Sequence, residues 1–298
     1  MHPAATLILL RETDGRLEAL MMRRGAGLSF MGGMWVFPGG RMENADQSPE
    51  ALGRILPDAR GIGLAQLRTM QGAAIDADAA AGFHVAACRE AFEEAGVLLA
   101  CAASGEPCDA ATVTRLGARR EEVTADAAAF TRMLEAEDLF LDTRQLVYWS
   151  HWITPSIEPK RFDTRFFVAP LPAGQAASAD LSELTEHAWL EPANAPGALE
   201  RGEIRLVPPT LLTLEDLAES HARHGTLTAM LMAEAGRATP PVMPRIELTG
   251  NGARVVMPWD PGYGQMPGEG CEVAQGFPAH FTRRRSSQTL SRAREPAR

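Results

Sequence analysis

The motif REAFEEAGV occupies residues 89–97 and carries the most informative pattern of the chain. On a helix, Glu90, Glu93 and Glu94 lie at positions i, i+3 and i+4, so three carboxylates crowd one face. Like charges so close together repel one another unless something neutralises them. A hard divalent cation does so, because Mg²⁺ takes oxygen ligands and shares them with substrate phosphates. Arg89, four residues before Glu93, can also orient a carboxylate through a salt bridge.

The surroundings of the motif distinguish a functional site from a solvated acidic helix face. A helix is expected over 84–95, ended by Gly96 just after its last turn. The segment GAGLSFMGGMWVFPGG at 25–40 precedes it, with a short strand at 34–37 and a turn at 38–40. Glycines allow the close backbone approach that a Cβ atom prevents. This glycine-rich loop favours the functional interpretation.

With these residues the chain resembles a Nudix hydrolase. Gly40 matches the first glycine of the family's box, and Arg89 to Val97 match its whole second half, with Ala91 as a small version of an aliphatic position. Asp46 stands where the first glutamate of the box belongs. Residues 41–88 separate the two halves, a much longer stretch than the continuous box has, so a segment is inserted.

One subfamily, the enzymes similar to the peroxisomal coenzyme A diphosphatase, also carries a long insertion inside the box. Its characteristic segments resemble FMGGMWVFPGG at 30–40, WITP at 152–155 and KRFDTRFF at 160–167 of this chain. The resemblance covers roughly residues 4–265. It implies the α/β/α Nudix sandwich, an α/β fold with a mixed sheet between helices, here with two helical insertions and an extended C-terminal segment.

The resemblance also implies a metal site. Glu90, Glu93 and Glu94 would hold Mg²⁺ or Mn²⁺, with the main-chain carbonyl of Gly39 as a further ligand. Glu93, Glu94 and Arg89 are the predicted catalytic residues of the box. A metal that bridges two phosphates draws charge off the diphosphate and fixes an attacking water.

In several family members another glutamate, on a loop before a tryptophan-containing strand, ligates metal or acts as the base. Glu183 and Glu186 precede Trp189 and are the candidates here. Each could equally be a surface residue.

The substrate would be a small nucleotide, and coenzyme A carries both a diphosphate and a ribose 3′-phosphate that need cations. Arg23 and Arg24 end a strand, so one of them could be a solvated terminus. Trp35 and Phe37 could stack on adenine or belong to the core. Lys160 or Arg161 could meet the 3′-phosphate, and we expect Arg161→Ala to lower efficiency on coenzyme A selectively. The predicted substrate-binding residues are Arg23, Arg24, Trp35, Phe37, Gly40, Lys160 and Arg161.

Composition narrows the class of protein. The chain has 298 residues, 45% of them hydrophobic and 22% charged, which is ordinary for a globular protein. Its net charge of −9 argues against nucleic acid as a partner. No apolar run approaches the roughly 18 residues that cross a bilayer. The four cysteines form no CxxC pair, so we expect reduced, mostly buried thiols in a cytoplasmic protein. The sequence leaves open whether the protein forms a homodimer.

The expected organisation is a Nudix domain over 1–237 with insertions at about 47–81 and 102–146. A Pro/Gly-rich extension over 238–276 and a disordered basic tail over 277–298 follow. Strands are expected at 7–10, 17–23, 147–153, 165–168 and 187–190. Further helices are expected at 125–136, 210–222 and 227–235.

The function predicted is metal-dependent hydrolysis of a diphosphate, with coenzyme A or acyl-CoA cleaved to 3′,5′-ADP and a 4′-phosphopantetheine product. ADP-ribose, a dinucleotide or another nucleoside diphosphate derivative is the alternative substrate. A Nudix module that senses a nucleotide without hydrolysing it is the alternative from another class. Such a module would tolerate loss of box carboxylates, and this chain keeps Glu90, Glu93 and Glu94.

Overall fold

A computed structural model describes residues 1–28, 31–59, 66–70, 72–179, 184–249, 252–266 and 268–271. Within these ranges eight strands form one mixed sheet. They are β1 (His2–Thr13), β2 (Arg16–Arg24), β3 (Trp35–Val36), β4 (Gly39–Arg41), β7 (Val147–Ile153), β8 (Phe162–Pro170), β9 (Leu184–Leu190) and β10 (Pro241–Val242).

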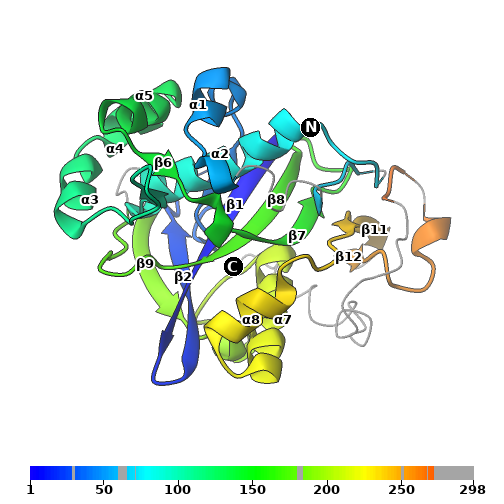
Figure 1. The fold of residues 1–298 in the computed structure, drawn as a ribbon. Helices are drawn as coiled ribbons and strands as arrows, with labels where there is room; N and C mark the ends of the chain where they lie inside the picture. Colours follow the sequence, from blue (N-terminus) through cyan, green and yellow to red (C-terminus); the bar gives the residue numbers. More distant parts are fainter. Residues whose placement is uncertain are drawn as a thin grey trace.

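The strands of the sheet follow the order β10-β7-β8-β1-β2-β3. Figure 1 labels the central strands β7, β8, β1 and β2. Strand β4 also pairs with β1, and β9 also pairs with β2. The pairs β1–β8 and β10–β7 are parallel, and the other pairs are antiparallel. The sheet is therefore mixed, as predicted.

Strand β1 is buried on both faces. Leu7 and Leu9 pack into one hydrophobic cluster, while Ile8 and Leu10 pack into another on the opposite side. Successive side chains of a strand point to opposite faces, so a continuous apolar run fits a strand covered on both sides. This arrangement produces the three layers of the sandwich.

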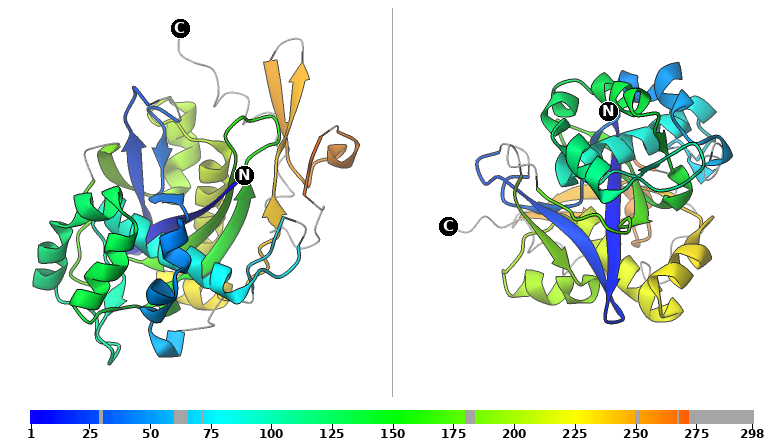
Figure 2. Two further views of the ribbon diagram at one scale, coloured as in Figure 1. Left: turned by 90° about the horizontal axis from the view of Figure 1, so that it is seen from above. Right: turned by 60° about the vertical axis from the view of Figure 1, so that its left-hand side comes forward.

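The helix that carries the motif, α2 (Ala77–Ala95), covers one face of the sheet (Figure 1). The two insertions lie on the same side of the sheet as α2 (Figure 2). Their elements are α1 (Pro49–Gly53), α3 (Ala110–Gly117), α4 (Arg120–Ala125), α5 (Ala128–Ala136) and the short strand β6 (Phe140–Leu141), which pairs with β5 (Ala100–Cys101) just before the second insertion. Both insertions thus thicken the first helical layer.

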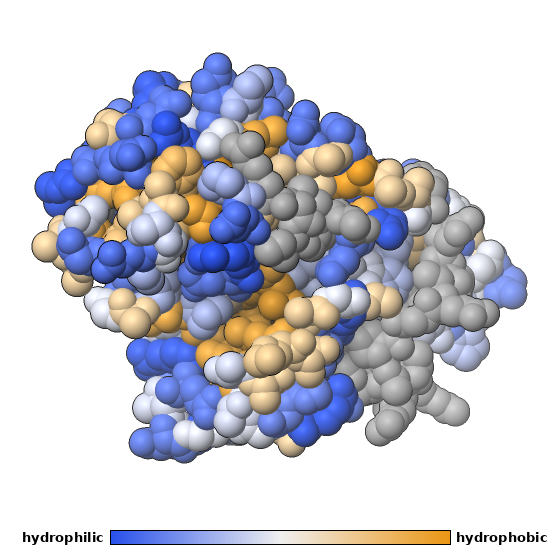
Figure 3. All heavy atoms as spheres, viewed as in Figure 1, coloured by the Kyte–Doolittle hydropathy of each residue, from blue (hydrophilic) through white to orange (hydrophobic). Residues whose placement is uncertain are grey.

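The opposite face is covered by α6 (Ala195–Glu200), α7 (Pro208–His224) and α8 (Leu227–Glu234). Pro208 and Pro209 open α7, where a missing N–H costs no helical hydrogen bond. On the face shown in Figure 3, hydrophilic side chains cover most of the outer helices, and hydrophobic side chains gather between α8 and the helices above it. The short 3₁₀ helices are η1 (Asn44–Gln47), η2 (Pro57–Ala59), η4 (Thr143–Gln145), η5 (Pro192–Asn194) and η6 (Tyr263–Gln265).

Two predicted helix boundaries were wrong. Helix α2 begins at Ala77 rather than near residue 84, because the side chain of Asp76 accepts a hydrogen bond from the Asp78 N–H and caps an earlier start. The helix predicted over 125–136 is α5, which begins at Ala128 instead of residue 125 because the chain leaves α4 at this point. There the Asp126 carboxylate accepts a hydrogen bond from the Ala128 N–H at 3.1 Å and starts a new helix.

The C-terminal extension is more regular than predicted. Strand β10 joins the edge of the main sheet, where its proline needs no ladder partner. The strands β11 (Arg245–Thr249) and β12 (Gly252–Val256) form a separate antiparallel hairpin beside it (Figure 2). The Pro/Gly-rich composition concealed these short strands. The basic tail over 277–298 lies outside the described residues.

The four cysteines are free thiols, as predicted. Cys88, Cys101 and Cys271 are buried, and Cys108 is half-buried. In the part of the chain that the structure describes, no helix is both long and apolar enough to cross a membrane.

His84 on α2 makes the stability of the fold dependent on pH. Its ring is buried against Phe167, and burial lowers its pKa to about 4. The unfolded chain, with a pKa near 6.5, then takes up the proton first, so this contribution is lost as pH falls from 6.5 toward 4. Between pH 7.5 and 5 the loss is about 2 kcal/mol. Urea unfolding of wild type and His84→Leu should show this extra acid sensitivity in wild type alone, and equal sensitivity would contradict it.

Candidate active site

The C-terminal end of α2 presents the acidic face of the motif to the interior. The helix ends at Ala95, and Gly96 follows in the left-handed conformation with a φ of +66°, as predicted. Glu90 and Glu93 are each only 8% exposed. This burial excludes the alternative of a solvated acidic helix face.

Arg89 connects the carboxylates. Its Nη1 donates to Glu90 Oε1 at 2.9 Å and to Glu93 Oε1 at 2.6 Å. Its Nη2 donates to the main-chain oxygen of Arg41 at 2.8 Å. Burial opposes its charge, but the hydrogen bond with Asp46 and the charges of Glu90 and Glu93 raise the pKa of Arg89 overall. The guanidinium therefore stays charged and holds two glutamates in fixed positions.

Asp46, the departure from the family box, is the other anchor of Arg89. Its two carboxylate oxygens accept from Arg89 Nε and Nη2 at 2.8 and 2.9 Å, and the side chain is 2% exposed. Oδ2 also accepts from the Glu43 N–H at 2.8 Å. The first insertion begins directly after η1 and ends within α2. The ion pair between Asp46 and Arg89 therefore joins the part of the box before the insertion to the part after it.

Two glycines of β4 lie against the glutamates. The Gly39 N–H donates to Glu94 Oε2 at 2.9 Å. A Cβ atom on Gly40 would lie 2.5 Å from Glu90 Oε1, and one on Gly39 would lie 2.6 Å from the Ala5 carbonyl oxygen. Glycine thus permits the close approach of β4 to α2 at Gly40 and to β1 at Gly39.

The carboxyl groups hold protons more strongly than usual. Burial raises the pKa of Glu90 to about 7, although the charge of Arg89 opposes the rise, and the charge of Glu93 adds to it. Burial also raises the pKa of Glu93 against the effect of Arg89. Loss of solvent and the charge of Glu90 raise the pKa of Glu94 further, while the hydrogen bond from Gly39 lowers it.

The three glutamates supply the oxygen donors that a hard divalent cation prefers. Among the described residues, no three His, Cys, Asp or Glu side chains converge on one point suited to a metal ion. Glu90 and Glu93 contact Arg89, and Glu94 contacts the Gly39 N–H. The oxygen donors and the raised pKa values of the three glutamates nevertheless fit a hard cation, which stabilises ionised carboxylates.

The second insertion supplies a residue that the sequence did not suggest. Arg120, on α4, donates from Nε and Nη2 to the Glu93 carbonyl oxygen at 2.9 and 2.8 Å, and from Nη2 to the Glu94 carbonyl oxygen at 2.8 Å. These are terminal carbonyls of α2, which lack helical partners and carry the negative end of the helix dipole. Arg120 thus fixes the end of the helix that carries the glutamates.

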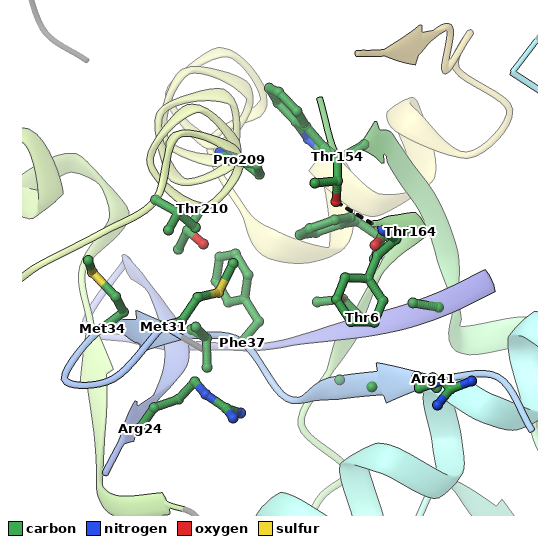
Figure 4. Close-up of a pocket in the computed structure, with 18 of the residues that line it drawn as sticks. Thr6, Arg24, Met31, Met34, Phe37, Arg41, Thr154, Thr164, Pro209 and Thr210 are labelled. Atoms are coloured by element: carbon green, nitrogen blue, oxygen red, sulfur yellow. Dashed lines mark hydrogen bonds between the residues drawn. The ribbon is translucent and has the colours of Figure 1, made fainter. Parts of the chain in front are cut away.

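A pocket of about 800 Å³ opens over this end of α2. Figure 4 shows Met31, Met34 and Phe37 on one side of it, and Thr154 and Thr164 on the other. The predicted site residues that line the pocket are Arg24, Phe37, Gly39, Gly40, Glu90, Glu93, Glu94 and Lys160.

Other predicted site residues lie elsewhere. Arg23 and Glu186 form an ion pair of 3.2 Å between β2 and β9, with both side chains about half exposed. Trp35 is half-buried against the second hydrophobic cluster. Arg161 donates to the Thr154 carbonyl oxygen and to Glu269 Oε2, at 3.2 and 2.8 Å, and does not itself line the pocket. Glu183 lies outside the described residues.

Comparison with known proteins gives the family. The profile of the NUDT19 Nudix domain matches residues 3–217. The chain belongs to the NUDT19 Nudix family. It is 30% identical over 266 residues to the human acyl-coenzyme A diphosphatase NUDT19, a match that covers 81% of this chain and 71% of the human protein. The chicken protein of the same name is 30% identical over 254 residues, covering 71% of this chain and 66% of that protein.

A solved structure agrees with the fold. The crystal structure of a NUDIX hydrolase from Alicyclobacillus acidocaldarius superposes with a TM-score of 0.61 at 26% identity, covering 74% of this chain and 91% of that one. These matches confirm the predicted Nudix fold and the predicted class of enzyme, a hydrolase of diphosphate bonds. Nudix hydrolases generally use divalent metal ions.

Proposed function

We propose that this enzyme hydrolyses the diphosphate of coenzyme A or acyl-CoA to 3′,5′-ADP and 4′-phosphopantetheine or its acyl derivative. The observation that carries the proposal is a single pocket that is lined by the box glutamates, by Lys160 and by an apolar wall. Coenzyme A combines the same features, since its diphosphate lies between a phosphorylated nucleotide and a pantetheine arm that has a dimethyl-substituted carbon near its start. The human and chicken relatives are named acyl-coenzyme A diphosphatases.

The proposed cofactor is Mg²⁺ or Mn²⁺, held by Glu90, Glu93, Glu94 and the Gly39 carbonyl oxygen. When bound, the metal would neutralise charge on the diphosphate and lower the pKa of an attacking water. Arg89 holds Glu90 and Glu93 in place, and the Gly39 N–H holds Glu94. These positions are set before substrate arrives, so little reorganisation is needed during the reaction.

Arg24 is the proposed diphosphate contact on the protein side. It lines the pocket, and its charge lowers the pKa of Glu94, which indicates that the two groups lie close to each other. A guanidinium at this point can donate to phosphate oxygens with good geometry. Arg23, in its ion pair with Glu186, is not part of this proposal.

Lys160 is the proposed partner of the ribose 3′-phosphate. It is the only lysine of the chain, it lines the pocket, and its Nζ lies 5.4 Å from the centre of the Phe162 ring. Removing one charge-assisted contact costs about 1.5–3 kcal/mol. We therefore expect Lys160→Ala to lower kcat/KM on coenzyme A by roughly ten- to a hundredfold, with little change on dephospho-coenzyme A.

Arg161→Ala is the matched control for this experiment, because Arg161 neighbours Lys160 but does not line the pocket, and its guanidinium is bound by Glu269 and by the Thr154 carbonyl oxygen. Steady-state kinetics on both substrates decide between the two cations. A selective loss in Arg161→Ala, with none in Lys160→Ala, would assign the 3′-phosphate to Arg161. Equal losses on both substrates in Lys160→Ala would give Lys160 another role.

A substrate panel tests the proposed function as a whole. Coenzyme A, acyl-CoA, ADP-ribose and a dinucleoside polyphosphate are compared by kcat/KM in the presence of Mg²⁺. We expect the coenzyme A compounds to be the best substrates. A clear preference for ADP-ribose or the dinucleotide would contradict the proposal, and cleavage of none would indicate a nucleotide-sensing module.

A further inference from the structure

The pocket has two chemically different ends. At one end, the loop with Met31 and Met34 lies against the segment before α7, since the Trp35 N–H donates to the Arg205 carbonyl oxygen at 2.9 Å. Figure 4 shows the two methionines near Phe37, facing the start of α7. The side chains that line this end are Met31, Met34, Phe37, Leu206, Pro208 and Pro209. These side chains are apolar, and the Arg24 side chain lies at the border of this end.

The box glutamates Glu90, Glu93 and Glu94 lie next to this apolar end of the pocket. The Arg24 N–H donates to the Met34 carbonyl oxygen at 3.0 Å, and the charge of Arg24 acts on Glu94. Glu94 in turn accepts from the Gly39 N–H at 2.9 Å. A diphosphate held between Arg24 and the glutamates would therefore have the methionines immediately beside it.

The far end of β4 is charged rather than apolar, since Arg41 and Lys160 line the pocket together with Glu43 and Glu158. Arg41 Nη2 lies 2.9 Å from His2 Nδ1, and the His2 ring stands 6.1 Å from the Phe162 ring. Lys160 Nζ lies over the same Phe162 ring. The chain from Met34 to Arg41 therefore runs from an apolar end, past the box glutamates, to an end whose side chains are charged.

We infer that the Met31–Met34 end binds the pantoyl part of the pantetheine arm and thereby selects coenzyme A over ADP-ribose. This inference rests on the proposed function and adds the orientation of the substrate. The pantoyl group carries two methyl groups close to the diphosphate and suits adaptable thioether side chains. ADP-ribose has a hydroxylated ribose at the same place, and its hydroxyls would lose water against the methionines without gaining partners.

A double variant, Met31→Gln with Met34→Gln, tests the inference by changing polarity with little change in size. The ratio of kcat/KM on coenzyme A to kcat/KM on ADP-ribose is expected to fall about tenfold or more. Met232→Gln is the matched control, because Met232 on α8 is 76% exposed, and its ratio should equal that of wild type. An unchanged ratio in the double variant would overturn the inference.

Binding of the separate products gives a second measurement that does not depend on turnover. Titration calorimetry should show weaker binding of 4′-phosphopantetheine to the double variant, by about tenfold, while 3′,5′-ADP binds as to wild type. Equal weakening of both products would indicate a structural effect and overturn the inference. If wild type binds 4′-phosphopantetheine in this selective way but cleaves no coenzyme A, the proposed function fails while the subsite stands.

Discussion

Glu94→Gln is expected to lower kcat by about a hundredfold to a thousandfold at saturating Mg²⁺, because one electrostatic stabiliser of the reacting diphosphate is lost. The amide oxygen of glutamine can still accept the Gly39 hydrogen bond, so the local geometry should persist. Removing one of three neighbouring negative charges should leave the thermal unfolding temperature unchanged or raise it. This variant should therefore lose turnover without losing stability.

The measurement is kcat over a range of Mg²⁺ concentrations, together with thermal unfolding of the same samples. Glu200→Gln serves as the control, because Glu200 is an exposed carboxylate at the end of α6. Near-normal turnover of Glu94→Gln at saturating Mg²⁺ would show that Glu94 is not part of the metal site. A large drop in unfolding temperature would show that its role is structural.

Arg89→Met is expected to have the largest effect on stability. It leaves the carboxylate of Asp46 buried at 2% exposure without its bidentate partner, and it releases Glu90 and Glu93. Removing one side of a buried ion pair costs about 3–5 kcal/mol. Urea unfolding should show a loss of that size, and turnover should fall by about a hundredfold or more because the glutamates lose their positions.

A second change separates the two effects of Arg89→Met. Adding Asp46→Leu removes the stranded carboxylate, and replacing both partners of a buried pair by apolar groups is often neutral. The double variant should regain part of the lost stability but none of the activity. Recovered activity would mean that Arg89 does not position Glu90 and Glu93, and Arg89→Met with wild-type stability would contradict the ion pair itself.

The parts of the site that depend on local residue spacing could be predicted from the sequence. The i, i+3, i+4 pattern places Glu90, Glu93 and Glu94 on one face of a helix wherever that helix lies, and Gly96 marks its end. The apolar runs of β1 and β7 are buried on the sheet, which made these strands predictable. Such features follow from the periodicity of the backbone alone.

Features that depend on long-range contacts were not predictable. Arg120 donates to main-chain carbonyl oxygens of α2. Every residue has such a carbonyl group, so the sequence does not indicate which one accepts the hydrogen bond. Lys160 and Arg161 are neighbours, yet only the first lines the pocket, because Glu269 of the C-terminal extension binds the second. The short strand β10 is stabilised by pairing with β7 rather than by its own residues.

Product analysis after incubation of coenzyme A with the wild-type enzyme tests the central claim most directly. With Mg²⁺, chromatography and mass spectrometry should detect 3′,5′-ADP and 4′-phosphopantetheine in equal amounts, and neither product should form after the metal is removed with EDTA. Intact coenzyme A under conditions in which ADP-ribose is cleaved, or the same products without any divalent metal, would contradict the account.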